Sequence, residues 1–201
     1  MAAPYDIQTY LLDRANIHDT VTRLTFNCDR KSMDGLIKDV YAPQVALDYT
    51  SMFGGQPFET TKEEWAKTIT SAAASFDKCQ HIVTGLIIEL PQPFNGATRP
   101  DKCRVFANVT AHMVRQAARG GPIMHDGVSL LPSTQYPRHF KLGSANGNIH
   151  NQAQFDLDVI RIPELEQKGE NPWRVSKQVV EVYWEQGNRD VIVDQVADIG
   201  N

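Results

Sequence analysis

Two ionisable residues on regular secondary structure are the first candidates for chemistry in this sequence. His81 lies near the start of a run from Gln80 to Leu90 in which residues alternate as they do in a buried strand. The face that carries it comprises His81, Val83, Gly85 and Ile87. Asp29 ends a run of helical periodicity, at a spacing that brings its carboxylate close to the buried stripe. A lone histidine on an apolar face is more often a satisfied core residue than a catalyst, so His81 needs a partner.

Asp29 is the candidate partner of His81. An imidazole with an ordinary pKa of about 6.5 takes up and returns protons near neutral pH. A carboxylate bonded to one ring nitrogen fixes the tautomer and raises the basicity of the other nitrogen, and such general acid–base catalysis contributes roughly 10²–10⁴-fold. With Asp29 present, we favour a catalytic His81 over a satisfied core histidine.

The elements that must position these residues begin with three predicted helices. Apolar spacing predicts an amphipathic helix from Ile7 to about Asp29 and a short helix that Ser32 caps and Ala42-Pro43 ends, with Met33 facing inward. The third helix opens with a capping box at Thr61 and carries Trp65 on its apolar stripe. Phe53 lies before it, in a loop predicted over residues 51–60.

Alternating residues predict strands over residues 45–50, 80–90, 102–115, 148–162 and 173–184, followed by a short helix within 188–199 that carries Ile192, Val196 and Ile199. Tyr49 and Asp48 have opposite parity, and Asp48 is expected to point outward. In the strand 102–115, the mixed face with Asn108 and His112 suggests a lined cavity. In the strand 148–162, the polar face with Asp156 fits a pocket acid and a solvent-facing residue equally well. Residues 116–147 form an inserted loop, which is a lid, an oligomer arm or a plain surface loop.

Composition excludes several classes of function. The 201 residues, 41% of them hydrophobic, suffice for one sizeable core, so we expect a single domain over residues 1–201. A formal charge of −4 leaves no basic excess for nucleic acid or anionic membranes. There is no basic, apolar leader and no run of roughly 18 apolar residues that could span a membrane. Three cysteines without paired spacing argue against a disulfide framework or a zinc site, so we expect a soluble, cytoplasmic protein.

The order of elements resembles the SnoaL-like family of the nuclear transport factor two-like superfamily, and within it the scytalone dehydratases. The matching stretches are Asp29-Arg-Lys-Ser-Met-Asp-Gly-Leu, Ala42-Pro43 with Leu47-Asp48-Tyr49, Gln80-His81-Ile-Val-Thr-Gly85, and Trp173-Arg-Val through Tyr183-Trp184. The resemblance implies an α+β fold, a cone in which a curved mixed or antiparallel sheet is closed by three N-terminal helices around a cofactor-free pocket. It also implies a homo-oligomer, a dimer or trimer formed through exposed sheet faces.

The same resemblance assigns roles to individual residues. His81 matches the catalytic histidine, Asp29 the carboxylate that orients it, Tyr49 a tyrosine that helps hold a water on the substrate carbonyl, and His112 a second pocket histidine. Cys28 stands where the dehydratase has a tyrosine, and Gln154 and Asp156 replace a serine and an asparagine, which predicts a different substrate. The predicted substrate-binding residues are Cys28, Phe53, Trp65, Asn108, Gln154 and Asp156.

The predicted function is therefore a cofactor-independent dehydratase for a hydroxylated, carbonyl-bearing cyclic natural product such as a polyketide. A cyclase or double-bond isomerase would use the same pocket, and a non-catalytic module that binds a small molecule would use the same cone. A metal enzyme is the remaining alternative. Its ligands would be His112, His125, Asp126, His139 and His150, which lack a compact ligand spacing, so we predict no metal.

Overall fold

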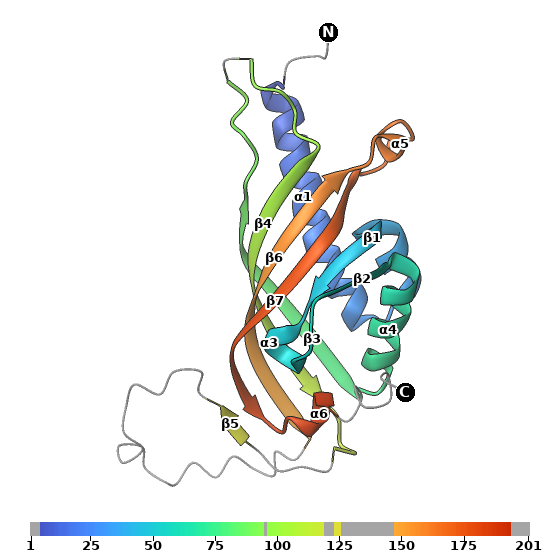
Figure 1. The fold of residues 1–201 in the computed structure, drawn as a ribbon, viewed down its shortest axis with the longest axis vertical. Coiled ribbons are helices and arrows are strands. Elements are labelled where there is room, and N and C mark those ends of the chain that lie inside the picture. Colours follow the sequence, from blue (N-terminus) through green and yellow to red (C-terminus); the bar gives the residue numbers. More distant parts are fainter. Residues whose placement is uncertain (1–4, 95, 119–122, 126–146, 194–201) are drawn as a thin grey trace, which may run out of the picture.

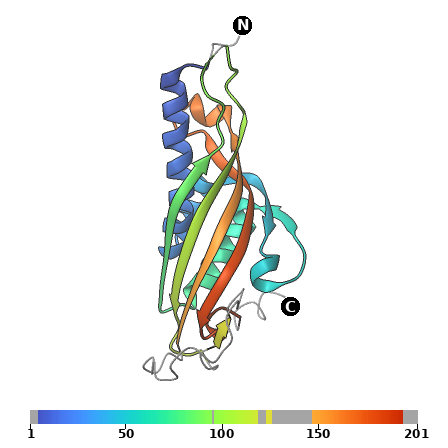
Figure 2. The same cartoon turned by 90° about the vertical axis from the view of Figure 1, so that its left-hand side faces the viewer.

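The computed structural model describes residues 5–94, 96–118, 123–125 and 147–193, and its core is a curved mixed sheet that wraps around helices (Figures 1 and 2). The strands are β1 (Tyr41–Asp48), β2 (Phe58–Thr61), β3 (Lys78–Ile88), β4 (Lys102–Val114), β5 (Ile123–His125), β6 (Asn148–Arg161) and β7 (Trp173–Gly187). The helices are α1 (Ile7–Asp29), α2 (Met33–Gly35), the π-helix η1 (Leu36–Val40), α3 (Thr50–Phe53), α4 (Lys62–Ala74), α5 (Pro163–Glu166) and α6 (Asp190–Val193).

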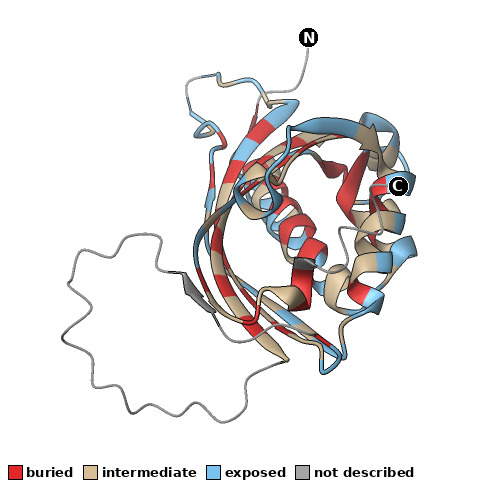
Figure 3. Ribbon diagram, turned by 60° about the horizontal axis from the view of Figure 1, so that its bottom comes forward, coloured by how far each residue is buried: buried red, intermediate tan, exposed pale blue. Residues whose placement is uncertain are grey.

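The sheet order is β2-β1-β7-β6-β4-β3, with β5 paired to β7, so the described sheet is open between β2 and β3. The pairing of β1 with β7 is parallel, whereas the other pairings are antiparallel. Helices α1 and α4 lie on the concave side, and buried segments alternate with exposed ones along the strands (Figure 3). The predicted α+β architecture, a cone of curved mixed sheet closed by N-terminal helices, is confirmed.

Helix α1 has the predicted bounds and a defined end on each side. The Asp6 carboxylate caps its start, accepting a hydrogen bond from the Thr9 N–H at 2.7 Å. At the other end Lys31 takes a left-handed conformation (φ 55°), and the Ser32 N–H donates back to the Asn27 carbonyl at 2.9 Å. This is the hydrogen-bonded turn that commonly ends helices. It stops α1 directly after Asp29, which places that carboxylate at the helix end.

The second helical segment differs from the prediction. Ser32 does cap it, but after α2 the chain continues as the π-helix η1 and enters β1 at Tyr41, so Pro43 lies within a strand. Proline fits there because the register between β1 and β7 is interrupted between Tyr41 and Ala46, and no ladder bond needs its missing N–H. Met33 is 37% exposed and does not face inward as expected.

Two strand faces also depart from simple alternation. In β3 the pairing with β4 shifts between Thr84 and Ile87, where Gly85 has a positive φ of 62°. The bulge inverts the parity, so Ile87 is 60% exposed and does not share the face of His81 as predicted. Strand β1 ends at Asp48, and Tyr49 is the N-cap residue of the short helix α3. Asp48 points away from the concave side, as expected, and accepts hydrogen bonds from the Thr50 N–H and hydroxyl.

A buried ion pair joins α1 to the sheet at the end of the molecule away from β5. Asp13 is fully buried and accepts two hydrogen bonds from Arg99, at 2.9 and 2.7 Å, and one from the Trp173 indole N–H at 2.9 Å. Arg99 also donates to Glu166 at 2.6 Å. This network fixes the start of α1 against β7 and the loop before β4.

Much of the predicted insertion lies outside the described residues. Within 116–147, strand β5 pairs with the end of β7, while residues 119–122 and 126–146 are not described. The predicted C-terminal helix is present as α6, where Ile192 is buried, but Val196 and Ile199 lie outside the described residues. No described helix is long and apolar enough to cross a membrane.

Candidate active site

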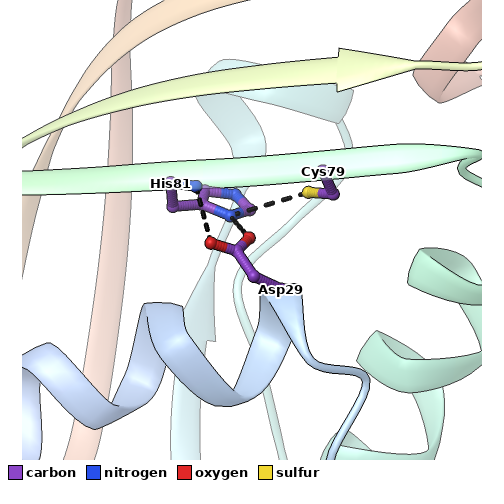
Figure 4. Close-up of side chains that lie close together, drawn as sticks. All are labelled: Asp29, Cys79 and His81. Carbon is purple, nitrogen blue, oxygen red and sulfur yellow. Dashed lines mark hydrogen bonds and ion pairs between the residues drawn. The ribbon is translucent and has the colours of Figure 1, made fainter.

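Asp29 and His81 meet at the end of α1 (Figure 4). The Nδ1–H of His81 donates to Asp29 Oδ1 at 2.6 Å, and the backbone N–H of His81 donates to Oδ2 of the same carboxylate at 2.8 Å. Because an ionised carboxylate only accepts hydrogen bonds, this contact assigns the ring proton to Nδ1. It leaves the Nε2 lone pair available as a base, as the sequence predicts for a proton-transfer pair.

The local folding of both elements explains this contact. Helix α1 packs against β3, and its end turn stops the helix directly after Asp29, which places the carboxylate beside His81. A carboxylate at a helix C-terminus faces the negative end of the helix dipole, which is unfavourable. The two hydrogen bonds from His81 offset this cost, so neither residue is well satisfied without the other.

An apolar cavity of about 370 Å³ lies between the concave face of the sheet and α4. Its polar lining groups include His81, Tyr49, Gln178 and Asn151. The apolar lining comes from all the surrounding elements, including Leu24, Phe53, Phe58, Trp65, Ile69, Phe76, Val109, Met113, Phe155 and Val180. Such a cavity suits a compact cyclic ligand with few polar groups, because each buried polar atom needs a partner.

Two cysteine thiols stand beside the pair and line the cavity. Burial and the neighbouring Asp29 raise the pKa of Cys28 to about 12. Burial, again with Asp29, raises the pKa of Cys79 well above its ordinary value, and the Cys79 sulfur lies 3.7 Å from His81 Nδ1. Both thiols therefore remain protonated at neutral pH, which makes them poor nucleophiles.

Asp29, Cys79 and His81 are also the residues that could hold a metal ion among those described, with ligand atoms within 4.8 Å of one another. Their donor types would suit zinc. Yet Asp29 Oδ1 and His81 Nδ1 are 2.6 Å apart, whereas two ligands of one tetrahedral zinc lie roughly 3.3 Å apart, given bonds of about 2.0–2.1 Å. The arrangement is that of a hydrogen-bonded pair. Of the ligands of the alternative metal site, Asp126, His139 and the side chain of His125 lie outside the described part of the structure.

Four predicted site residues besides the pair line the cavity, namely Cys28, Tyr49, Phe53 and Trp65. The Tyr49 ring packs against Trp65, with ring centroids 5.3 Å apart, and stacks on Phe53 at 6.2 Å. Burial raises the pKa of Tyr49, so its hydroxyl stays protonated. Its oxygen accepts a hydrogen bond from Gln178 Nε2 at 2.9 Å.

The other four predicted residues lie on the convex face, so their prediction as pocket residues is wrong. His112 pairs with His150, with 3.1 Å between their Nδ1 atoms. Asp156 forms two hydrogen bonds with Arg104, at 2.8 and 2.6 Å. Gln154 accepts a hydrogen bond from Tyr183, and Asn108 is exposed opposite Gln154 in the sheet register. The cavity faces the opposite and mainly apolar side of these strands, which contains Ala111 and Met113.

Sequence reasoning missed Gln178 and Asn151, which are both 1% exposed. Asn151 had a visible signal, since it occupies a position between Ile149 and Ala153 where the alternation calls for an apolar residue. Its Nδ2 has no hydrogen-bond partner among the described residues. A buried donor of this kind costs free energy unless a ligand or neighbour pairs with it.

Asn151 lies in line with His81 across the sheet. Ala111 is paired with His81 on one side and with Asn151 on the other. Two strand spacings separate the outer pair, so their Cα atoms are about 10 Å apart. On the far side Asn151 is paired with Glu185, whose Oε1 is likewise buried and unpaired within the described chain. The cavity wall thus presents a base and an amide on either side of a small alanine.

The fold and the internal pocket together define a cone of the nuclear transport factor 2-like class. Among similar solved structures is the Kfla4162 protein from Kribbella flavida, with a TM-score of 0.65, 17% identity, and coverage of 93% of this chain and 99% of that one. A protein from Novosphingobium aromaticivorans, provisionally assigned as a scytalone dehydratase, has a TM-score of 0.59 and 12% identity, with coverage of 91% and 96%. The hexachlorocyclohexane dehydrochlorinase LinA-type3 from Novosphingobium barchaimii has a TM-score of 0.55 and 14% identity, with coverage of 88% and 91%.

The sequence comparison identifies the family. Residues 9–136 match the SnoaL-like domain, and the chain therefore belongs to the SnoaL-like family. No curated protein sequence matches the chain.

Proposed function

We propose that the protein is a cofactor-independent acid–base lyase that removes water from a hydroxylated, carbonyl-bearing cyclic compound such as a polyketide. The observation that carries this proposal is the pairing of Asp29 with His81 at the wall of an apolar cavity. A base held in one tautomer, with its free nitrogen in a water-poor pocket, is the minimum equipment for removing a proton from carbon.

The residues provide for each step of an elimination. His81 Nε2 takes the proton from the carbon beside the substrate carbonyl, and the electron pair moves toward the carbonyl oxygen. Tyr49, protonated and at the cavity wall, donates to that oxygen as negative charge develops. When the enolate re-forms the carbonyl, the bond to the β-hydroxyl breaks, and the proton on His81 leaves with that hydroxyl as water. Asp29 stabilises the imidazolium between the two transfers.

Asn151 provides a second point of recognition. Its unpaired Nδ2 lies about two strand spacings from His81, with Ala111 between them. A ring system lying over Ala111 would bring one oxygen to the amide while another part of the ring reaches the base. A substrate with two or more oxygens on one or two rings fits this spacing and the cavity of about 370 Å³.

The names of two structural neighbours are consistent with an elimination. One is provisionally assigned as a scytalone dehydratase and the other is a dehydrochlorinase. Both names denote loss of a small molecule across a carbon–carbon bond, which is the type of reaction that one base and one oxyanion contact can support. The identities of 12% and 14% relate these proteins to this chain through the fold alone.

The test is turnover of a panel of cyclic β-hydroxy ketones, followed by mass spectrometry for loss of water. His81→Ala should lower the rate roughly 10²–10⁴-fold. His18→Ala, which removes an exposed histidine from α1, serves as the matched control and should leave the rate unchanged. A product of unchanged mass would instead indicate an isomerase or cyclase. Binding without any product would indicate a non-catalytic module, and full activity of His81→Ala would refute the acid–base assignment.

A further inference from the structure

Three side chains form a polar chain that runs from the core to the cavity wall. The Tyr41 hydroxyl donates to Gln178 Oε1 at 2.8 Å, and Gln178 Nε2 donates to the Tyr49 oxygen at 2.9 Å. Tyr41 and Gln178 are each 1% exposed, and Gln178 and Tyr49 both line the cavity. The chain therefore starts in the core and ends at the ligand space.

The irregular pairing of β1 with β7 makes this contact possible. From Tyr41 to Ala46 the chain advances five residues, while its partner strand advances only from Val175 to Lys177. The surplus residues shorten the span of β1, which brings both tyrosines within reach of Gln178. Regular pairing would hold residues eight positions apart at opposite ends of a strand, roughly 26 Å from each other.

The direction of the hydrogen bonds follows from the burial of Tyr41. Its side chain is 1% exposed, and Gln178 is the hydrogen-bond partner of its hydroxyl among the described residues. A buried hydroxyl proton needs an acceptor, so the Tyr41 proton points to Gln178. Gln178 must then present its carbonyl to Tyr41 and its amide N–H to Tyr49.

The Tyr49 oxygen accepts a hydrogen bond from Gln178, and its own proton has no acceptor among the described residues. We propose that Gln178, held by Tyr41, is a positioning residue. By donating to the Tyr49 oxygen it directs the Tyr49 proton into the cavity, where that proton selects a carbonyl oxygen. This inference rests on the proposed function, because it specifies the group that the lyase polarises.

The chemical consequence is a preference for oxygens that only accept. A carbonyl or enolate oxygen pairs directly with the Tyr49 proton, whereas an alcohol at the same place must turn its own proton toward apolar walls. Orienting the donor before the ligand arrives also removes an ordering cost from the reaction step. The preference should therefore appear in binding as well as in turnover.

The experiment measures dissociation constants of 1-tetralone and tetralin, which share a bicyclic shape but differ in the carbonyl. Fluorescence of Trp65 in the cavity wall can report both. The ketone-to-hydrocarbon affinity ratio is compared in wild type, Tyr49→Phe, Gln178→Met and the double variant. A neutral hydrogen bond is worth about 1 kcal/mol, so Tyr49→Phe should lower the ratio about fivefold. Gln178→Met should lower it about two- to fivefold, with no further effect in the Tyr49→Phe background.

The matched control is Gln152→Met. Gln152 accepts a hydrogen bond from the Trp184 indole on the convex face, so its loss should not alter the ratio. If Gln178→Met does not fold, Tyr41→Phe removes one hydroxyl, frees the amide to turn, and should lower the ratio about twofold in the same cycle. Tetralin affinity reports whether the cavity is intact.

An unchanged ratio in Gln178→Met or in Tyr49→Phe would overturn the inference. An equal fall with and without Tyr49 would also overturn it, because Gln178 would then contact the ligand itself. These are binding measurements, so their outcome is separate from that of the turnover test: inactive protein with the predicted ratios would overturn the lyase and retain the donor assignment.

Discussion

The replacement of Asp29 by asparagine tests how the proton-transfer pair works. The carboxylate accepts hydrogen bonds from both the ring and the backbone N–H of His81. In Asp29→Asn the amide oxygen can keep the backbone contact, and the amide nitrogen then faces Nδ1. Because that nitrogen only donates, Nδ1 must become the acceptor and the ring proton must move to Nε2. The nitrogen that we propose as the base would then carry the proton.

The size of the effect follows from these contacts. A hydrogen bond to a charged group contributes about 1.5–3 kcal/mol, so exchanging one of them for a weaker neutral contact should cost about 2 kcal/mol. For a chain of this length that corresponds to a fall in Tm of roughly 4–8 °C. Loss of the correct tautomer should lower turnover roughly 10²–10⁴-fold, because the general base is removed.

The assay is ¹⁵N NMR of the His81 ring, which reads the tautomer without a substrate. Wild type should show Nδ1 protonated and Nε2 free, and Asp29→Asn the reverse. Asp48→Asn is the control, since Asp48 also accepts two hydrogen bonds, from Thr50, but faces away from the cavity. A ring that remains protonated at Nδ1 in Asp29→Asn, with turnover unchanged, would refute the reasoning.

Three further outcomes follow from the charges and thiols described above. Arg99→Met leaves the buried Asp13 carboxylate without its charge partner and should lower the free energy of unfolding by about 3–5 kcal/mol. Calorimetry should then show a fall in Tm of roughly 6–20 °C, with tetralone binding unchanged. A smaller loss would show that Asp13 is not held as a charge. Burial and the nearby His112 lower the pKa of His150, so the unfolded chain binds more protons at acid pH. Stability should therefore fall as pH drops below about 6.5, and His150→Gln should flatten that fall in denaturant titrations; an unchanged slope would contradict this. With its pKa raised to about 12, Cys28 should react roughly 10³-fold more slowly than a free thiol at pH 7.5, measured by mass spectrometry of the labelled peptide, and rapid native labelling would contradict this.

Local interactions explain what could be predicted from sequence. The bounds of α1 and the capping box of α4 depend on side chains within one or two turns, and both appear in the structure as expected. The family resemblance predicted the fold and pointed to Asp29 and His81, whose Oδ1 and Nδ1 atoms lie 2.6 Å apart in the structure. On β4 and β6 the prediction pointed to the polar faces, whereas the mainly apolar faces line the cavity.

By itself, the sequence determined the ends of α1, the start of α4, most of the alternation along the strands, and which side chains could transfer a proton. Tertiary structure alone decided which face of each strand is concave, because sheet curvature depends on pairing between distant segments. It also decided that Tyr41 and Tyr49 share Gln178, since the irregularity that brings them together is a property of β1 and β7 paired, and neither strand shows it alone. The candidate base could be predicted from single residues and their local spacing, whereas the pocket around it depends on how strands far apart in the chain are aligned.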